Sequence, residues 1–139
     1  AVTRVESLMA VVDLVKLSDE DAAWLYPGVE PAAVLSRLVA LGPGLAVMTR
    51  GGEGSLLASS AALVEVPAPA TVVADTIGAG DSYMGALIHR VLTTSLGMQL
   101  RARSELWGEE LSAIGAFASK VAAITVSRSG ANPPRLDEL

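Results

Sequence analysis

The sequence lacks cysteine altogether and has few aromatic residues, which make up 4% of its 139 positions. The absence of cysteine excludes disulfide bonds, thiolate metal sites and a cysteine nucleophile. Basic residues are also scarce, because 10 lysines and arginines stand against 15 aspartates and glutamates, a net charge of −5. Nucleic-acid binding needs clustered basic side chains, so we expect no nucleic-acid partner.

Long apolar runs are missing as well, and this absence bears on where the protein resides. Charged residues and prolines interrupt the apolar stretches well before the roughly 18 residues that a membrane span needs. Residues 1–10 carry Arg4 and Glu6 and do not show the basic and then apolar pattern of a signal peptide. We therefore expect a cytoplasmic protein with no membrane partner.

The residues that are present favour a single globular α/β unit over residues 1–139. Hydrophobic residues reach 51% and charged residues only 18%, which argues against disorder. Apolar periodicity and capping signals predict strands and helices in turn. The expected strands cover 11–17, 45–49, 55–58 and 63–66. The expected helices cover 4–10, 18–25, 31–41, about 81–96 and 109–126, with a connector at 97–108.

Residues 75–81, DTIGAGD, carry the densest chemical signal. Gly78 and Gly80 bracket Ala79 directly before a predicted helix. Glycine allows a backbone to approach a ligand closely, and the first N–H groups of a helix have no internal partner. We therefore expect the amides of residues 78–81 to form an anion site, most naturally for a phosphate.

Asp81 places a carboxylate beside this expected phosphate site. The two would repel each other, so the pairing makes sense if the carboxylate accepts the proton of a hydroxyl that attacks phosphorus. On the residues alone, a glycine turn with a dipole-stabilised aspartate is the alternative. Two other phosphate motifs are excluded. Ala86 and Leu87 stand where a Walker loop needs Lys and Ser or Thr, and Tyr83 stands where the dinucleotide fingerprint needs glycine.

Residues 75–88, DTIGAGDSYMGALI, resemble the C-terminal signature of the ribokinase-like (PfkB) sugar kinases. The resemblance implies that Asp81 is the catalytic base, and that the backbone of Gly78, Ala79 and Gly80 forms the anion hole for the transferred γ-phosphoryl group. It also implies a three-layer ribokinase-like fold, with a central, mostly parallel sheet flanked by helices. The chain is expected to be the C-terminal, ATP-binding portion of such a kinase, without the N-terminal sugar-binding and lid portion.

Residues 49–54, TRGGEG, resemble the T-x-G-x-x-G nucleotide element of the same family. The resemblance implies that Thr49, Gly51 and Gly54 bind the nucleotide. From the residues alone, a glycine hairpin turn is the alternative at this position.

Residues 16–21, KLSDED, resemble the segment that holds the family's N-x-x-E motif, which organises Mg²⁺ and phosphate through water. Ser18 stands in place of the Asn and Asp21 in place of the Glu. The resemblance implies that Ser18 lies on the nucleotide side and that Asp21 binds Mg²⁺ through water. Helix capping by the same two residues is the alternative.

Residues 117–131, FASKVAAITVSRSGA, resemble the family's last long helix and the turn after it. By this resemblance Ser119 lies near the adenine of ATP, and the turn lines a site for a monovalent cation, K⁺. The backbone carbonyls implied as its ligands belong to Asp75, Ile77, Thr125, Arg128 and Gly130.

Together these features predict an ATP- and Mg²⁺-dependent kinase that phosphorylates a sugar hydroxyl, with K⁺ as a further expected cofactor. Fructose is the first expectation, because residues 16–28 resemble bacterial fructokinase-type members. Ribose, 2-keto-3-deoxygluconate and a nucleoside are alternatives, and so is a non-catalytic nucleotide-binding or dimerisation module of the same fold. Asp81 disfavours a vitamin-precursor kinase, which usually has cysteine there. We also expect a homodimer, and weak or no turnover by these residues alone.

Overall fold

The computed structural model describes residues 1–139. Helices and strands follow one another along the chain as the sequence predicts. The helices are α1 (Val2–Met9), α2 (Asp19–Leu25), α3 (Pro31–Leu41), α4 (Ala79–Thr93), α5 (Leu96–Arg101) and α6 (Gly108–Val126). The strands are β1 (Leu14–Ser18), β2 (Leu45–Thr49), β3 (Ser55–Ala58) and β4 (Leu63–Val66), and short 3₁₀ turns cover Gly51–Glu53 and Leu136–Glu138.

The strands form one four-stranded sheet in the order β1-β2-β3-β4. β1 and β2 are parallel because the chain passes from one to the other through α2 and α3. Short turns join β2 to β3 and β3 to β4, and both of these pairs are antiparallel. The sheet of this chain is therefore mixed, and the prediction of a mostly parallel sheet holds only for the β1–β2 pair.

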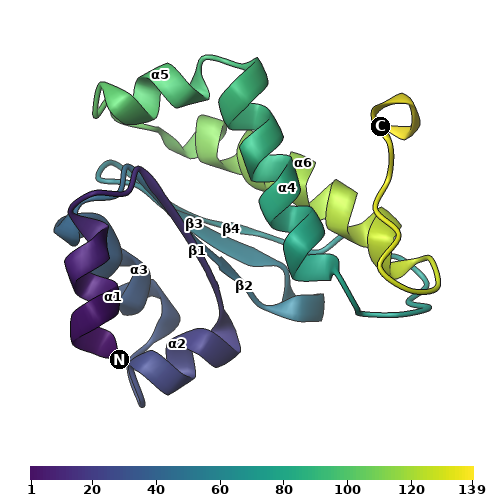
Figure 1. Cartoon of the computed structure of the whole chain (residues 1–139), viewed down its shortest axis with the longest axis horizontal. Helices are drawn as coiled ribbons and strands as arrows, with labels where there is room; N and C mark the ends of the chain where they lie inside the picture. The colour runs from purple at the N-terminus through teal and green to yellow at the C-terminus, as the bar shows by residue number, and fades with distance from the viewer.

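Helices cover both faces of the sheet and make three layers. Figure 1 shows α1, α2 and α3 on one face and α4, α5 and α6 on the other. Successive side chains of β2 point to opposite faces of the sheet, as expected for a strand that is buried on both sides. Leu45 and Val47 belong to the core shared with α4–α6, whereas Ala46 and Met48 belong to the core shared with α1–α3. The predicted three-layer α/β fold is confirmed.

Near the N-terminus the structure moves two predicted boundaries. The helix predicted over 4–10 starts earlier, at Val2. The strand predicted over 11–17 begins only at Leu14. Val11 lies in the turn after α1 and is 77% exposed. The prediction was wrong there because a run of apolar residues without alternation does not mark where a strand begins.

Around residue 95 the structure ends the predicted helix early and adds a second helix after it. α4 ends at Thr93, and the hydroxyl of Thr94 donates to the carbonyl of Arg90 at 2.6 Å. The predicted connector at 97–108 starts with helix instead, because α5 covers its first residues. Leu96 and Leu100, four residues apart, are both buried in the core. That spacing is the sequence signal for α5 that the prediction overlooked.

No helix of the chain combines the length and the apolar character that crossing a lipid bilayer requires. The longest helix, α6, has 19 residues. Its sequence includes Glu109, Glu110 and Lys120, so one of its faces is charged.

Candidate functional site

α4 begins at a glycine with left-handed backbone geometry. Gly78 directly precedes the helix with a φ of 80°, which glycine adopts without strain. A β-carbon at this position would lie 3.0 Å from the Cβ of Ala131, in the segment after α6. No side chain caps the helix, so the first amide groups depend on the backbone or on a ligand for partners.

Three amide groups at this helix start have no hydrogen-bond partner in the protein, namely those of Gly78, Gly80 and Asp81. The amide of Ala79 donates to the carbonyl of Thr76 at 3.3 Å, so it is engaged in the turn and not free as expected. Unpartnered amides at the positive end of a helix dipole attract an anion. The anion site stays a prediction, with three free donors in place of four.

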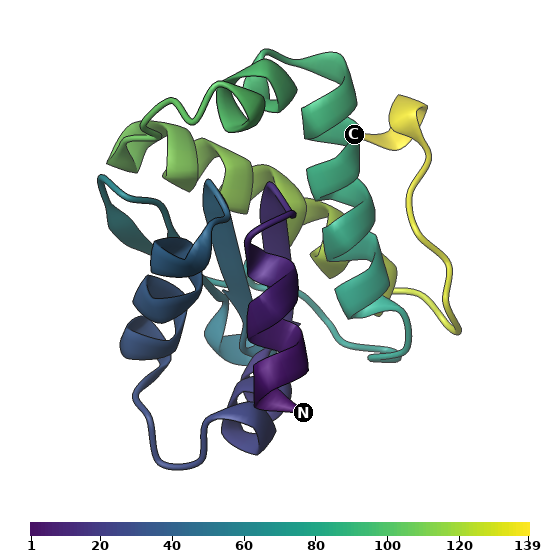
Figure 2. The same cartoon turned by 60° about the vertical axis from the view of Figure 1, so that its left-hand side comes forward.

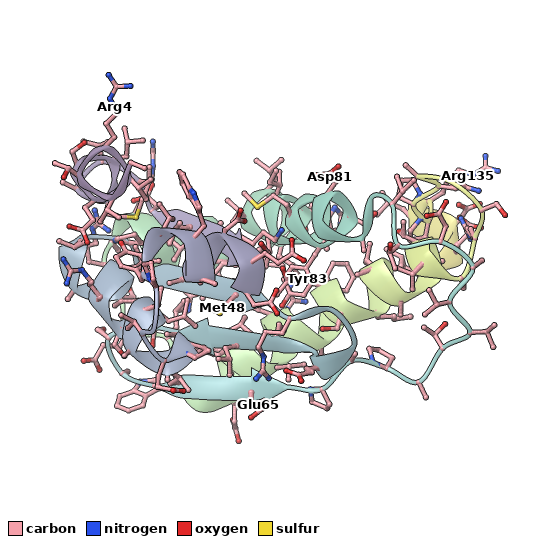
Figure 3. All side chains as sticks on the ribbon, turned by 90° about the horizontal axis from the view of Figure 1, so that it is seen from below. Arg4, Met48, Glu65, Asp81, Tyr83 and Arg135 are labelled. Atoms are coloured by element: carbon pink, nitrogen blue, oxygen red, sulfur yellow. The ribbon has the colours of Figure 1, made fainter.

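Asp81 lies in the first turn of α4 with its carboxylate exposed. In Figure 3 its side chain points away from the ribbon, whereas Tyr83 lies on the side of α4 that faces the sheet. The Asp81 carboxylate takes part in none of the protein's four ion pairs. It is therefore available to a group that approaches from outside, as a catalytic base must be.

Asp75 ties the loop before α4 to the turn after α6. Its Oδ1 accepts the N–H of Ile77 at 2.9 Å, and its Oδ2 accepts the N–H of Gly130 at 3.1 Å. The amides of Ala74 and Asp75 both donate to the carbonyl of Val126, at 2.7 and 3.1 Å. The loop that leads into α4 is therefore attached to a turn that lies 55 residues further along the sequence.

The carbonyls predicted to bind K⁺ lie on these same two segments. The carbonyl of Thr125 accepts the N–H of Arg128 at 3.1 Å, and the carbonyl of Gly130 accepts the N–H of Asn132 at 3.0 Å. Each carbonyl oxygen keeps a second lone pair, and backbone carbonyls are suitable K⁺ ligands. The donor types therefore fit a monovalent cation, and K⁺ binding stays a prediction.

A buried polar contact fixes the start of α4 against α6. The hydroxyl of Thr125, which is fully buried, lies 2.8 Å from the hydroxyl of Ser82 and 3.1 Å from the carbonyl of Val121. Ser82 is adjacent to Asp81, so this contact helps to hold the backbone of the first turn of α4 in place. Sequence reasoning missed Ser82, although a small polar residue on the inner face of an apolar helix was a signal for it.

Tyr83 anchors the sheet-facing side of α4. Its hydroxyl and the hydroxyl of Ser55 in β3 form a buried hydrogen bond of 2.8 Å. Burial raises the pKa of Tyr83 above its ordinary value, and hydrogen bonds with Ser55 and Ser119 oppose this shift. Ser119, predicted to lie near the adenine, is 6% exposed. Its contact with adenine stays a prediction, and it would require the base to reach this interior position.

The carboxyl ends of β1 and β2 meet at one edge of the sheet. Ser18 and Thr49, both predicted to lie on the nucleotide side, are paired at the last position of this parallel register. Ligands of α/β proteins commonly bind at such strand ends. Lys16 connects this edge to α4, because its Nζ lies 3.0 Å from the place of a β-carbon on Gly80. Sequence reasoning did not single out Lys16.

The glycine-rich segment after β2 forms a tight turn. Gly51 and Gly54 have φ values of 53° and 90°, and the amide of Arg50 donates to the carbonyl of Gly54 at 2.8 Å. A β-carbon on Gly54 would lie only 2.1 Å from the carbonyl oxygen of Val66. The structure therefore contains the hairpin turn that was the alternative, and nucleotide contacts from Thr49, Gly51 and Gly54 stay predictions.

Ser18 and Asp21 cap α2 reciprocally. The amide of Asp21 donates to the Ser18 hydroxyl at 3.0 Å, and the amide of Ser18 donates to Oδ2 of Asp21 at 3.0 Å. The hydrogen bonds from the Ser18 backbone and side chain lower the pKa of Asp21, and the charge of Lys16 lowers it further. Capping is thus present in the structure, and a water-mediated Mg²⁺ contact from Asp21 stays a prediction.

Asp21→Ala is expected to lower the free energy of unfolding by about 1 kcal/mol near neutral pH, because it removes half of this capping box. Since the pKa of Asp21 is lowered in the folded state, its contribution is present above about pH 3.9. The contribution disappears as the pH falls through the lower, folded-state value. Urea denaturation at neutral pH and in strong acid measures both effects. Glu20→Ala is the matched control, and an equal loss in both variants would contradict the expectation.

An open cavity of about 430 Å³ lies beside Asp81, lined by α4, α6 and the segment after α6. Figure 2 shows the C-terminal segment running alongside α4. Gly85 and His89 of α4 line the cavity together with Pro134. The ring of His89 stacks on Phe117, with centroids 5.9 Å apart. The cavity has room for a small molecule within reach of the Asp81 carboxylate.

Comparison with known proteins bears on the chemistry of this site. The model for the pfkB family of carbohydrate kinases matches residues 1–138. An uncharacterised sugar kinase of Pyrococcus horikoshii is 32% identical over 136 residues, which cover 96% of this chain and 37% of that protein. A fructokinase of Rhizobium leguminosarum bv. trifolii is 33% identical over 85 residues, which cover 61% of this chain and 26% of that protein.

Solved structures of sugar kinases also match this chain. The Pyrococcus horikoshii protein in complex with ATP matches with a TM-score of 0.72 at 33% identity, over 99% of this chain and 39% of that chain. The fructokinase of Xylella fastidiosa with bound ATP matches with a TM-score of 0.76 at 24% identity, over 94% of this chain and 41% of that chain. The latter likeness shows the fold alone. The chain thus spans well under half the length of these relatives.

Proposed function

Because this chain belongs to the pfkB family of carbohydrate kinases, we propose that it carries the ATP-binding and phosphoryl-transfer part of an ATP-dependent sugar kinase. The observation that carries the proposal is the arrangement of groups at the start of α4. There, the unpartnered amides of Gly78, Gly80 and Asp81 lie beside a carboxylate that has no ion-pair partner. Amides of this kind bind phosphate, and a free carboxylate next to them suits proton transfer.

The nucleotide would bind along the edge that joins β1, β2 and α4. The free amides of Gly78, Gly80 and Asp81 would hold oxygens of the γ-phosphoryl group, and Thr49 and Ser18 lie at the neighbouring strand ends. Support comes from the Pyrococcus horikoshii relative, which was crystallised with ATP. Mg²⁺, when bound with ATP, would neutralise phosphate charge. No three acidic or histidine side chains cluster here, so phosphates and water would supply most of its ligands, with Asp21 acting through water.

The acceptor hydroxyl would lie in the cavity beside Asp81. The Asp81 carboxylate accepts the hydroxyl proton while the hydroxyl oxygen forms a bond to the γ-phosphorus. The bond between this phosphorus and the bridging oxygen breaks, and its electron pair leaves with ADP. The amides at the start of α4 stabilise the charge on the phosphoryl oxygens during transfer. The products are a sugar phosphate and ADP.

The sugar is proposed as fructose, supported by the fructokinases among the relatives. Ribose, 2-keto-3-deoxygluconate and a nucleoside are the alternative acceptors. The reaction is proposed to take place in the cytoplasm, where ATP is available. A homodimer and activation by K⁺ belong to the same proposal.

An assay of ADP release by the intact protein tests this proposal. With Mg²⁺ and ATP, we expect fructose to raise ADP release well above the rate without sugar, to a turnover of about 1–100 per second. Ribose, 2-keto-3-deoxygluconate and a nucleoside serve as the comparison acceptors. Tight ATP binding without ADP release in the presence of any of these acceptors would contradict the proposed kinase and favour a non-catalytic nucleotide-binding module.

A further inference from the structure

A second open cavity, of about 350 Å³, lies at the end of α4 that is remote from Asp81. Its wall is formed by the last turn of α4, by the start of α6 and by α5, which lies beside this end of α4 (Figure 1). Arg90 of α4 and Glu110 of α6 are the charged side chains in this wall. The cavity shares no lining residue with the cavity beside Asp81, so the two are separate places on the molecule.

Arg90 and Glu110 each carry a buried polar atom that has no partner. The Nε of Arg90 and the Oε2 of Glu110 are shielded from solvent and make no hydrogen bond within the protein. Neither residue belongs to one of the four ion pairs. The two opposite charges therefore line one cavity without neutralising each other. Because buried polar atoms without a partner cost free energy, a ligand that bonds to both of them would be stabilised.

The places of these residues in their helices do not account for the missing partners. Arg90 lies in the last turn of α4 and Glu110 in the first turn of α6, where the helix dipoles favour these charges. A dipole gives no hydrogen-bond partner to a side chain. The guanidinium of Arg90 lies over the ring of Phe117, 5.4 Å from its centroid. This contact with the ring face orients the guanidinium and leaves its N–H groups free.

The charges in the wall define the class of ligand. A guanidinium binds a carboxylate through two parallel hydrogen bonds, and the carboxylate of Glu110 accepts hydrogen bonds from an ammonium group. A zwitterion matches one positive and one negative side chain, whereas a phosphate dianion would be repelled by Glu110. The wall also contains the buried apolar side chains Leu96, Leu106 and Ile114. These suit an apolar group on the ligand.

We infer that this cavity binds an α-amino acid with an apolar side chain. Its carboxylate bonds to Arg90, its ammonium group bonds to Glu110, and its side chain lies against the three apolar residues of the wall. Gln99 also lines the cavity. Its Oε1 lies 3.5 Å from the hydroxyl of Ser95, so its amide NH₂ is available to the ligand carboxylate. This binding site goes beyond the proposed kinase reaction and does not depend on it.

Thermal unfolding of the intact wild-type protein with free amino acids is the first test. At about 10 mM, we expect leucine, isoleucine or valine to raise the Tm by about 2 °C or more, with no rise for aspartate or lysine. For the compound that gives the largest rise, the matching carboxylic acid without the amino group and the matching amine without the carboxylate should have little effect. No rise with any of the three, or an equal rise with either truncated compound, would overturn the inference.

Calorimetric titration of variants with the same amino acid is the second test. Arg90→Gln and Glu110→Gln each remove one of the two charges, and each should lower the affinity about tenfold or more. Arg101→Gln and Glu109→Gln are the matched controls, because they remove the same charges from helix ends outside the cavity. Both controls should bind as the wild type does. Wild-type affinity in Arg90→Gln and Glu110→Gln would overturn the inference.

The two tests remain distinct from the test of the proposed kinase. They measure binding and stability, so a protein that transfers no phosphate would contradict the proposed function and leave the amino-acid site standing. A kinase that is fully active and binds no amino acid would overturn the amino-acid site alone. The truncated compounds are used with the wild type, so the inference can still fail if a variant does not fold.

Discussion

Asp81→Asn is expected to lower the turnover of the intact protein about a thousandfold while changing its affinity for ATP less than about threefold. Asparagine has nearly the shape of aspartate but cannot take the proton of the acceptor hydroxyl. The backbone amides at the start of α4 do not depend on the side chain, so phosphate binding should persist. Steady-state kinetics and calorimetric titration with ATP measure the two quantities.

Glu109→Gln provides the matched control for this substitution. Glu109 lies in the first turn of α6 and is exposed, as Asp81 is in α4. Both changes remove one acidic charge from the start of a helix, so any general effect on helix stability is shared. Turnover should stay at the wild-type level in the control. A loss of less than tenfold in Asp81→Asn would show that Asp81 is not the base.

Gly54→Ala is expected to lower the free energy of unfolding by about 3 kcal/mol or more. Gly54 has a φ of 90°, which disfavours any side chain. A β-carbon there would lie 2.1 Å from the carbonyl oxygen of Val66 and 2.8 Å from the amide nitrogen of Ala68. Both are backbone atoms, so the clash is relieved only if β3 and β4 move apart. Urea denaturation of the intact protein measures the loss.

Gly52→Ala is the control for that loss. Gly52 lies in the same turn, has no positive φ, and has open space where a β-carbon would be. Its free energy of unfolding should stay within about 0.5 kcal/mol of wild type. If both variants lost the same stability, the close approach at Gly54 would not be the cause. If Gly54→Ala were as stable as wild type, the need for glycine there would concern the nucleotide and not the fold.

The layered fold and the start of α4 were predictable because their signals are local. Apolar periodicity placed the strands and most helices, and two glycines before a helix predicted free amides at Gly78 and Gly80. The capping box of Ser18 and Asp21 also followed from spacing alone. In each case the residues that determine the geometry are within a few positions of one another.

The remaining features depend on contacts between distant segments, which one sequence does not reveal. The approach of the Lys16 side chain to Gly80, for example, depends on how β1 and α4 pack together. The link between Asp75 and Gly130 joins residues 55 positions apart. The mixed sheet could have been anticipated, since short turns flank β3 on both sides and short turns connect antiparallel strands.

The most direct test of the account follows the γ-phosphate itself. The intact protein is mixed with fructose and ATP labelled in the γ-phosphate, and the label is traced in a single turnover. We predict that the label appears on the sugar in the wild type, and that it remains on ATP in Asp81→Asn over the same interval although ATP is bound. Release of the label as free phosphate, or equal transfer by both proteins, would contradict the account.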